Sequence, residues 1–112
     1  MNDTRFSQYR VMWIMVFFDL PTETKKQVRD AAQFRKSLMQ DGFCMFQFSI
    51  YIRHCASREN MEVHIRRVRS LLPDEGKVGV LGITDKQFSE MQLFYCRKPK
   101  QPTIPGLQLE LF

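Results

Sequence analysis

An uninterrupted apolar segment, residues 11–18, dominates the hydropathy pattern near the start of the chain. It is too short to cross a bilayer and lacks the alternation of a half-exposed strand, so it predicts a central strand covered on both faces. Asp19 follows directly, and Pro21 ends the strand because proline removes a ladder donor. A carboxylate is therefore expected where the strand leaves the core. A solvated turn aspartate explains the same local pattern equally well.

Two later segments have the spacing of helices that pack one side against a sheet. The first begins at Thr22 or Thr24 as N-cap and stops at Gly42. Its apolar positions are Val28, Ala31, Ala32, Leu38 and Met39. The second begins after Ser57 and ends at Pro73, with His64 interpreted as a residue at the boundary of the core. Its apolar positions are Met61, Ile65, Val68 and Leu72.

The remaining ordered segments are rich in strand-forming residues. Residues 43–54 predict one strand or two, because no turn chemistry marks a hairpin in the middle. Gln47 and Ser49 have the same parity and are expected on one face, where a structural role is favoured over a functional one. Residues 76–84 predict a strand, 84–91 a short helical turn and 92–98 a further strand.

This order of elements predicts an α+β fold, a ferredoxin-like βαββαβ sandwich with both helices on one face of an antiparallel sheet. The strand at 92–98 is surplus, and we expect it to pair with the partner subunit of a homodimer. The chain then divides into a flexible lead-in (1–10), one domain (11–97) and a tail (98–112) that docks on the dimer mate or on another protein. The expected contact residues are Leu93, Phe94, Tyr95, Leu107, Leu109 and Leu111.

Charge narrows the choice of partner. The 112 residues carry seventeen Lys and Arg against twelve Asp and Glu, a net charge of +5, which favours an anionic partner such as nucleic acid. The candidate phosphate contacts are Lys25, Lys26, Arg29, Arg35 and Lys36 on the first helix and Arg66, Arg67 and Arg69 on the second. A merely solvated helix surface accounts for these residues equally well.

The cysteines and the hydropathy of the chain indicate the cellular compartment in which we expect the protein. Cys44, Cys55 and Cys96 form an odd, widely spaced set without a C-x-x-C pair, which argues against a disulfide framework or a zinc ribbon. The N-terminus has no apolar signal segment, and no run approaches the ~18 apolar residues of a membrane helix. We therefore expect a cytoplasmic protein with no membrane partner.

Four segments in order carry a family resemblance: FFDLP at the end of the first strand, GFCMFQFSIYIRH, GITDKQFSEMQLFYCRKPK and the terminal QLELF. Together they resemble the CRISPR-associated protein two (Cas-two) family, in the form found beside type II CRISPR systems. The resemblance implies a ferredoxin-like homodimer that works with the CRISPR integrase (Cas-one) when foreign DNA is inserted as a new spacer. It also implies that some members cleave RNA or DNA with magnesium.

The resemblance assigns roles to two residues. Asp19 matches the family's strand-end metal aspartate, and Ser49 matches the serine of its second-strand motif. Thr22 and Glu23 stand where many relatives have a second acidic residue just after the proline. One carboxylate per chain is few for Mg²⁺, which takes near-octahedral oxygen ligands and keeps several waters. A two-fold axis that brings together Asp19 of both subunits would supply two carboxylates.

Two classes of function follow from these features. The first is a binding scaffold, a basic homodimer that spans duplex DNA between integrase subunits through phosphate contacts. The second is a metal-dependent phosphodiesterase acting on RNA or DNA, either within this family or as a stand-alone ribonuclease of the related toxin type that cleaves single-stranded RNA. An RNA-recognition-type sheet binder is disfavoured, because the K/R-G-F/Y-G/A-F motif is missing.

Overall fold

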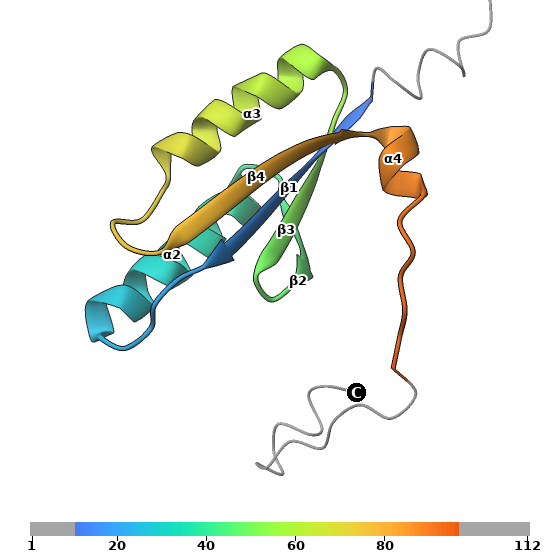
Figure 1. Ribbon diagram of the computed structural model, residues 1–112. Helices are drawn as coiled ribbons and strands as arrows, with labels where there is room; N and C mark the ends of the chain where they lie inside the picture. The colour runs from blue at the N-terminus through green and yellow to red at the C-terminus, as the bar shows by residue number, and fades with distance from the viewer. Residues whose placement is uncertain (1–10, 97–112) are drawn as a thin grey trace, which may run out of the picture.

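The computed structural model describes residues 11–96, which form a four-stranded antiparallel sheet with two long helices on one face (Figure 1). The sheet order is β2-β3-β1-β4, which is the order of a split βαβ sandwich, so the predicted ferredoxin-like βαββαβ topology is confirmed. The elements are β1 (Met12–Asp19), α2 (Lys25–Gln40), β2 (Cys44–Gln47), β3 (Ile50–Cys55), α3 (Arg58–Ser70), β4 (Lys77–Thr84) and α4 (Asp85–Ser89).

Strand β1 is an inner strand of the sheet, as its hydropathy predicted. It pairs along most of its length with β3, from Met12 opposite Cys55 to Phe17 opposite Ile50. On its other edge it pairs with β4, and the last pair of that ladder joins Asp19 to Lys77. The apolar run is therefore held by backbone hydrogen bonds on both sides, which fixes the position of its end.

The two faces of the sheet differ in cover. Met12, Ile14, Val16 and Phe18 point toward the helices and are buried. They pack with residues of α2 and α3 in one core, which includes Phe34, Leu38, Met61 and Val68.

The other face of the sheet, here called the open face, is lined by apolar residues but no long helix lies on it (Figure 1). Phe17 is 46% exposed and Leu81 48% exposed. The prediction that β1 is covered on both faces is therefore wrong, because both long helices lie on the same side of the sheet. The open face consists of Trp13, Met15, Phe17, Ile50, Ile52, Leu81 and Ile83.

Helix α2 begins at one of the two predicted N-caps, Thr22 and Thr24, and ends where the sequence predicted. Thr24 is the N-cap, and its hydroxyl accepts from the Gln27 amide at 3.1 Å. Gly42 follows the last turn with φ +92°, a conformation that favours glycine. The buried positions are Ala31, Phe34 and Leu38. Val28 and Met39 are exposed, contrary to prediction, because at 100° per residue they fall at the margins of that stripe.

Helix α3 shows a similar shift of the predicted stripe. Ser57 is the N-cap as expected, but the buried residues are Met61, His64 and Val68. The prediction that His64 is a boundary residue is wrong, since it lies three residues after Met61 and four before Val68 on the buried side. Leu72 is exposed because the helix has already ended at Ser70.

Residues 43–54 form a hairpin, which resolves the choice between one strand and two. Gln47 pairs with Ile50, and the two residues between them make the turn. Ser49 therefore lies in the turn and not on a strand, so the prediction that it shares a strand face with Gln47 is wrong. The turn forms without Gly, Asn or Pro because β3 is fixed by its pairing with β1.

Residues 92–96 of the strand predicted at 92–98 form no strand with the rest of residues 11–96. Residues 92–96 follow α4, have no ladder partner and lead away from the sheet (Figure 1). Leu93, Phe94 and Tyr95 are exposed. A strand needs the backbone of a neighbour, so pairing with a second subunit stays a prediction. Leu107, Leu109 and Leu111, the lead-in 1–10 and the tail 98–112 lie outside the described residues.

Candidate functional site at the end of β1

Asp19 is the last residue of β1 and is exposed. It has the parity of Phe17 and therefore belongs to the edge of the open face. The backbone of β1 is paired with β4 up to this residue, so its Cα is held by the sheet while its carboxylate reaches solvent. Among the ion pairs of residues 11–96, none includes Asp19. Its carboxylate is thus available to an external ligand.

Ser49 lies beside the end of β1. Its backbone carbonyl accepts a hydrogen bond from the Phe18 amide at 3.0 Å, and Phe18 directly precedes Asp19. This bond ties the β2–β3 turn to the end of the central strand. The structure thus brings together the two residues that the family motif singled out, although they are thirty positions apart in the sequence.

A hollow of about 260 Å³ opens at this point. Its wall is mostly apolar, with one acidic and one basic side chain at the strand ends. Gly79 lies opposite Phe17, and any side chain there would collide with the Phe17 ring, so the glycine lets that ring lie flat across β4. The lining residues are Phe17, Phe18, Asp19, Ser49, Ile50, Lys77 and Gly79.

The donor set suits half of a magnesium site. The Asp19 carboxylate and the Ser49 hydroxyl offer hard oxygen ligands of the kind that Mg²⁺ takes. Within residues 11–96, however, no group of three or more His, Cys, Asp or Glu is arranged to hold a metal. A single subunit therefore supplies part of a Mg²⁺ ligand set, and Asp19 of a second copy is the expected complement.

The predicted phosphate contacts on α2 differ in exposure and in their neighbours. Lys25, Arg29 and Lys36 are exposed and fall within about 40° of one another around the helix axis, so they form a basic stripe. Arg35 is half-buried and lies over the rings of Phe18 and Phe48.

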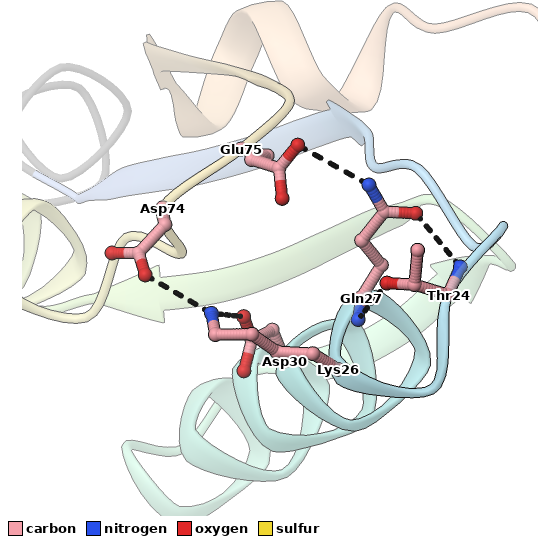
Figure 2. A network of polar contacts seen from close by, with 6 residues as sticks. All are labelled: Thr24, Lys26, Gln27, Asp30, Asp74 and Glu75. Carbon is pink, nitrogen blue, oxygen red and sulfur yellow. Dashed lines mark hydrogen bonds and ion pairs between the residues drawn. The ribbon is translucent and has the colours of Figure 1, made fainter.

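Lys26 is already paired with acidic side chains. Its Nζ lies 2.8 Å from Asp30 and 3.1 Å from Asp74, and these contacts raise its pKa (Figure 2). In the same network Gln27 donates to Glu75 at 3.2 Å. The network fastens the loop before β4 to the start of α2, so Lys26 is less available to phosphate than its neighbours on the helix.

The three arginines of α3 also differ. Arg66 and Arg69 are exposed and take part in none of the ion pairs of residues 11–96. Arg67 donates to Asp41 at 2.8 Å. The structure therefore leaves Arg66 and Arg69 as the better candidates for phosphate contacts.

Sequence reasoning missed a polar cluster between α2, α3 and β3. Arg53 can only donate, so His64 accepts at Nε2 (2.9 Å) and its Nδ1–H donates to Asp41 (2.8 Å). Burial raises the pKa of Asp41, but the hydrogen bonds from His64 and Arg67 outweigh it, and the net pKa is below its ordinary value. The signal in the sequence was the helical spacing of His64 from Met61 and Val68.

The other end of the open face is closed by α4. The rings of Trp13 and Phe88 stack with centroids 4.0 Å apart, and the Trp13 indole donates to Asp85 at 2.7 Å. His54 meets the Trp13 ring edge-on. The open face is thus anchored at one end by an aromatic cluster and ends at Asp19 on the other. Of the helices in residues 11–96, none has the length and apolar character needed to cross a membrane.

The fold and the strand-end aspartate define a class: ferredoxin-like α+β proteins that present a carboxylate at the end of their first strand. Residues 12–91 match the family model of CRISPR associated protein Cas2, and the chain belongs to this family. The fold agrees with a solved structure described as "Crystal structure of cas2", with a TM-score of 0.52, 16% identity, and cover of 84% of this chain and 99% of that one.

Curated relatives carry the same family name. The CRISPR-associated endoribonuclease Cas2 of Flavobacterium psychrophilum is 63% identical over 97% of this chain and 95% of its own length. The protein of the same name from Parvibaculum lavamentivorans is 46% identical over 90% of this chain and all of its own. The matches extend over nearly the full length of the relatives, so the likeness is not confined to the shared sheet.

Proposed function

We propose that this protein acts in CRISPR adaptation as a basic homodimer, which binds duplex DNA and holds the CRISPR integrase (Cas-one) during acquisition of new spacers in a type II system. Family membership supports the pathway. The excess of Lys and Arg supports a DNA partner, since neutralising phosphates releases counterions. The single observation that carries the proposal is the apolar open face that ends at Asp19.

The open face is the proposed dimer surface. Phe17 and Leu81 are about half exposed there, and contiguous apolar residues on a sheet face mark an interaction site. A second copy docked on this face gives a two-fold symmetric interface, in which the open face of one subunit contacts the open face of the other. The segment with Leu93, Phe94 and Tyr95 then joins a sheet edge of the partner.

The proposed DNA surface is on the opposite side of the sheet. Lys25, Arg29 and Lys36 form a stripe on α2, and Arg66 and Arg69 are exposed on α3. Both helices lie on the face away from the proposed dimer surface (Figure 1). The two surfaces therefore do not compete, and a dimer presents basic helices on both of its outer sides.

Magnesium-dependent cleavage of a phosphodiester is the proposed chemical activity. In the dimer, Asp19 of both subunits holds the ion, with the Ser49 hydroxyls nearby as further oxygen donors. When bound, Mg²⁺ supplies water activation and charge stabilisation on the phosphate. Two carboxylates that approach each other without a cation would repel, so the pair itself favours binding of a divalent ion.

Asp19→Ala tests this role. We expect Mg²⁺-dependent cleavage of RNA or DNA to fall by about 100-fold or more, with dimerisation and DNA binding retained, because the carboxylate is exposed. Glu62→Ala, which removes an exposed carboxylate from α3, is the matched control. Cleavage by Asp19→Ala at the parent rate would refute the metal role, and loss of folding would show that Asp19 is structural.

A stand-alone metal-dependent ribonuclease of the related toxin type is the second candidate. The observation in its favour is that the relatives are named endoribonucleases. The two candidates differ in partner: the scaffold captures the integrase in a pull-down and binds duplex DNA. The ribonuclease cleaves single-stranded RNA with no added protein and captures no integrase.

A further inference from the structure

The turn between β2 and β3 carries an aromatic ring in an unusual position. Phe48 is 70% exposed although it is a large apolar residue. The guanidinium carbon of Arg35 lies 4.2 Å from the centroid of this ring, and 5.4 Å from that of Phe18. The cation therefore covers one side of Phe48 and leaves the rest of the ring to solvent.

Folding alone does not explain this phenylalanine. Two-residue hairpin turns favour Gly, Asn, Asp and Ser, each for a conformational or hydrogen-bonding reason that Phe lacks. Phe48 is also absent from the core formed by the buried residues. Its ring does little for the packing of residues 11–96 and is presented to whatever contacts the turn.

Arg35 has a hydrogen-bond donor that is not used within residues 11–96. Its Nε is buried, and within the described part of the chain it has no hydrogen-bond partner. Besides the buried Nε, a guanidinium carries N–H donors on its terminal nitrogens. The same side chain can therefore back the aromatic ring and donate to an anion beside it.

We propose that Phe48 and Arg35 form a subsite for an unpaired nucleotide, in which the base stacks on the open side of the Phe48 ring and a phosphate accepts from Arg35. The inference rests on the proposed function, because Phe48 is directly followed by Ser49, next to Asp19. It deepens that function by placing single-stranded nucleic acid at the site.

Chemistry selects an unpaired base over duplex DNA as the occupant. In a duplex each base is already stacked between its neighbours, and only its edges are accessible from the grooves. An unpaired base offers its π-face, and base–aromatic stacking tolerates any sequence because every base has such a face. The guanidinium beside the ring also favours an anionic ligand over an apolar protein surface.

Fluorescence anisotropy of the full-length protein tests the subsite. The probes are a short single-stranded RNA, the same sequence as single-stranded DNA, and a blunt duplex, all in EDTA to prevent cleavage. Phe48→Leu keeps an apolar side chain and removes the π-face, whereas Phe48→Tyr keeps the ring. We expect Phe48→Leu to weaken single-strand binding by at least about five-fold and Phe48→Tyr to stay within about two-fold of the parent.

Further variants separate stacking from charge. Arg35→Lys keeps the charge and loses the planar fork, so we expect it to weaken single-strand binding as well. Leu72→Ala, which truncates an exposed apolar residue just after α3, is the control and leaves binding unchanged. Binding of the blunt duplex stays the same in all four variants, because none of the three residues changed belongs to the proposed duplex surface, which is formed by Lys25, Arg29, Lys36, Arg66 and Arg69.

Several results would overturn the subsite. They are single-strand binding by Phe48→Leu equal to that of the parent, no single-strand binding by the parent, or a parallel loss of duplex binding. A shift of Phe48→Leu to a smaller species in sedimentation would assign the ring to a protein interface instead. A different result would refute the proposed function: the parent protein would bind the single strands, but it would neither cleave with Mg²⁺ nor capture the integrase.

Discussion

The two faces of the sheet are both apolar, yet they behave differently. On the helix-covered face, side chains such as Ile14 and Val16 are fully buried against α2 and α3. On the open face, alternate residues of the same strand remain partly exposed, and Phe17 is the most exposed of the apolar ones. Strand β1 supplies both sets, because side chains alternate across a strand.

The difference separates the part of the apolar run that serves folding from the part that we propose serves assembly. The covered face closes a core within one subunit. The open face is apolar enough to need cover, and no element of residues 11–96 covers it beyond α4 at the Trp13 end. Four predictions test this division, in order of expected effect.

The largest effect is expected from truncating a leucine on each side of the sheet. Leu38→Ala removes a fully buried side chain of α2 and should lower the free energy of unfolding by about 2 to 5 kcal/mol. Leu81→Ala on the open face should cost under about 1 kcal/mol at protein concentrations that dissociate the dimer. Urea unfolding of both variants measures this, and equal losses would show that the open face also belongs to the folding core.

Phe17→Asp should break the proposed dimer and leave the subunit folded. A carboxylate placed in an apolar interface must be desolvated, so we expect the dimer Kd to rise by about 100-fold or more. Val28→Asp is the matched control, since Val28 is also about half exposed but lies on α2. Analytical ultracentrifugation measures dimerisation, and circular dichroism measures folding. A Phe17→Asp variant that remains dimeric would move the interface away from the open face.

The arginines of α3 should differ in their share of DNA binding. Replacing Arg66 and Arg69 with Gln should flatten the slope of log affinity against log salt by about one unit for each phosphate that is no longer neutralised. Arg67→Gln should change the slope less, because Arg67 is held by Asp41. Titration of a duplex at several salt concentrations measures the slopes, and an unchanged slope for the double variant would assign both arginines to the solvated surface.

The smallest effect concerns pH. The folded pKa of Asp41 lies below its ordinary value of 3.8, so its contribution to stability is present above that pH and is lost as pH falls through the folded pKa. We expect Asp41→Asn to lose roughly 1.5 kcal/mol at neutral pH and to show a smaller decline in stability at acid pH. Urea midpoints from neutral to acid pH measure both, and parallel curves for variant and parent would contradict the prediction.

Much of the fold followed from local pattern. The strand at residues 11–18, the N-caps Thr24 and Ser57 and the stop at Gly42 each depend on neighbouring residues, and each is where the sequence placed it. The burial of residues at the edge of a helix's apolar side could not be predicted in this way. His64 is buried only because Asp41 and Arg53, from other elements, satisfy both of its ring nitrogens.

The candidate site was visible in the sequence only as two separate residues. Asp19 could be identified from the end of an apolar strand, and Ser49 from its resemblance to a family motif. Their proximity depends on the bond between the Phe18 amide and the Ser49 carbonyl, which forms once β3 pairs with β1. The long-range partners of Lys26 and Arg67 were equally hidden, since Asp74 and Asp41 lie 48 and 26 positions away.

The sequence by itself determined the order of strands and helices, the basic charge and the aspartate at the end of β1, because each is written in adjacent residues or in composition. Only the tertiary structure decided which face of β1 stays open, which cations are already paired and what lies beside Asp19. The order of elements predicted both long helices on one side of the sheet, but it did not say which side they cover or which distant residues contact each other. Local propensity contains no information about either.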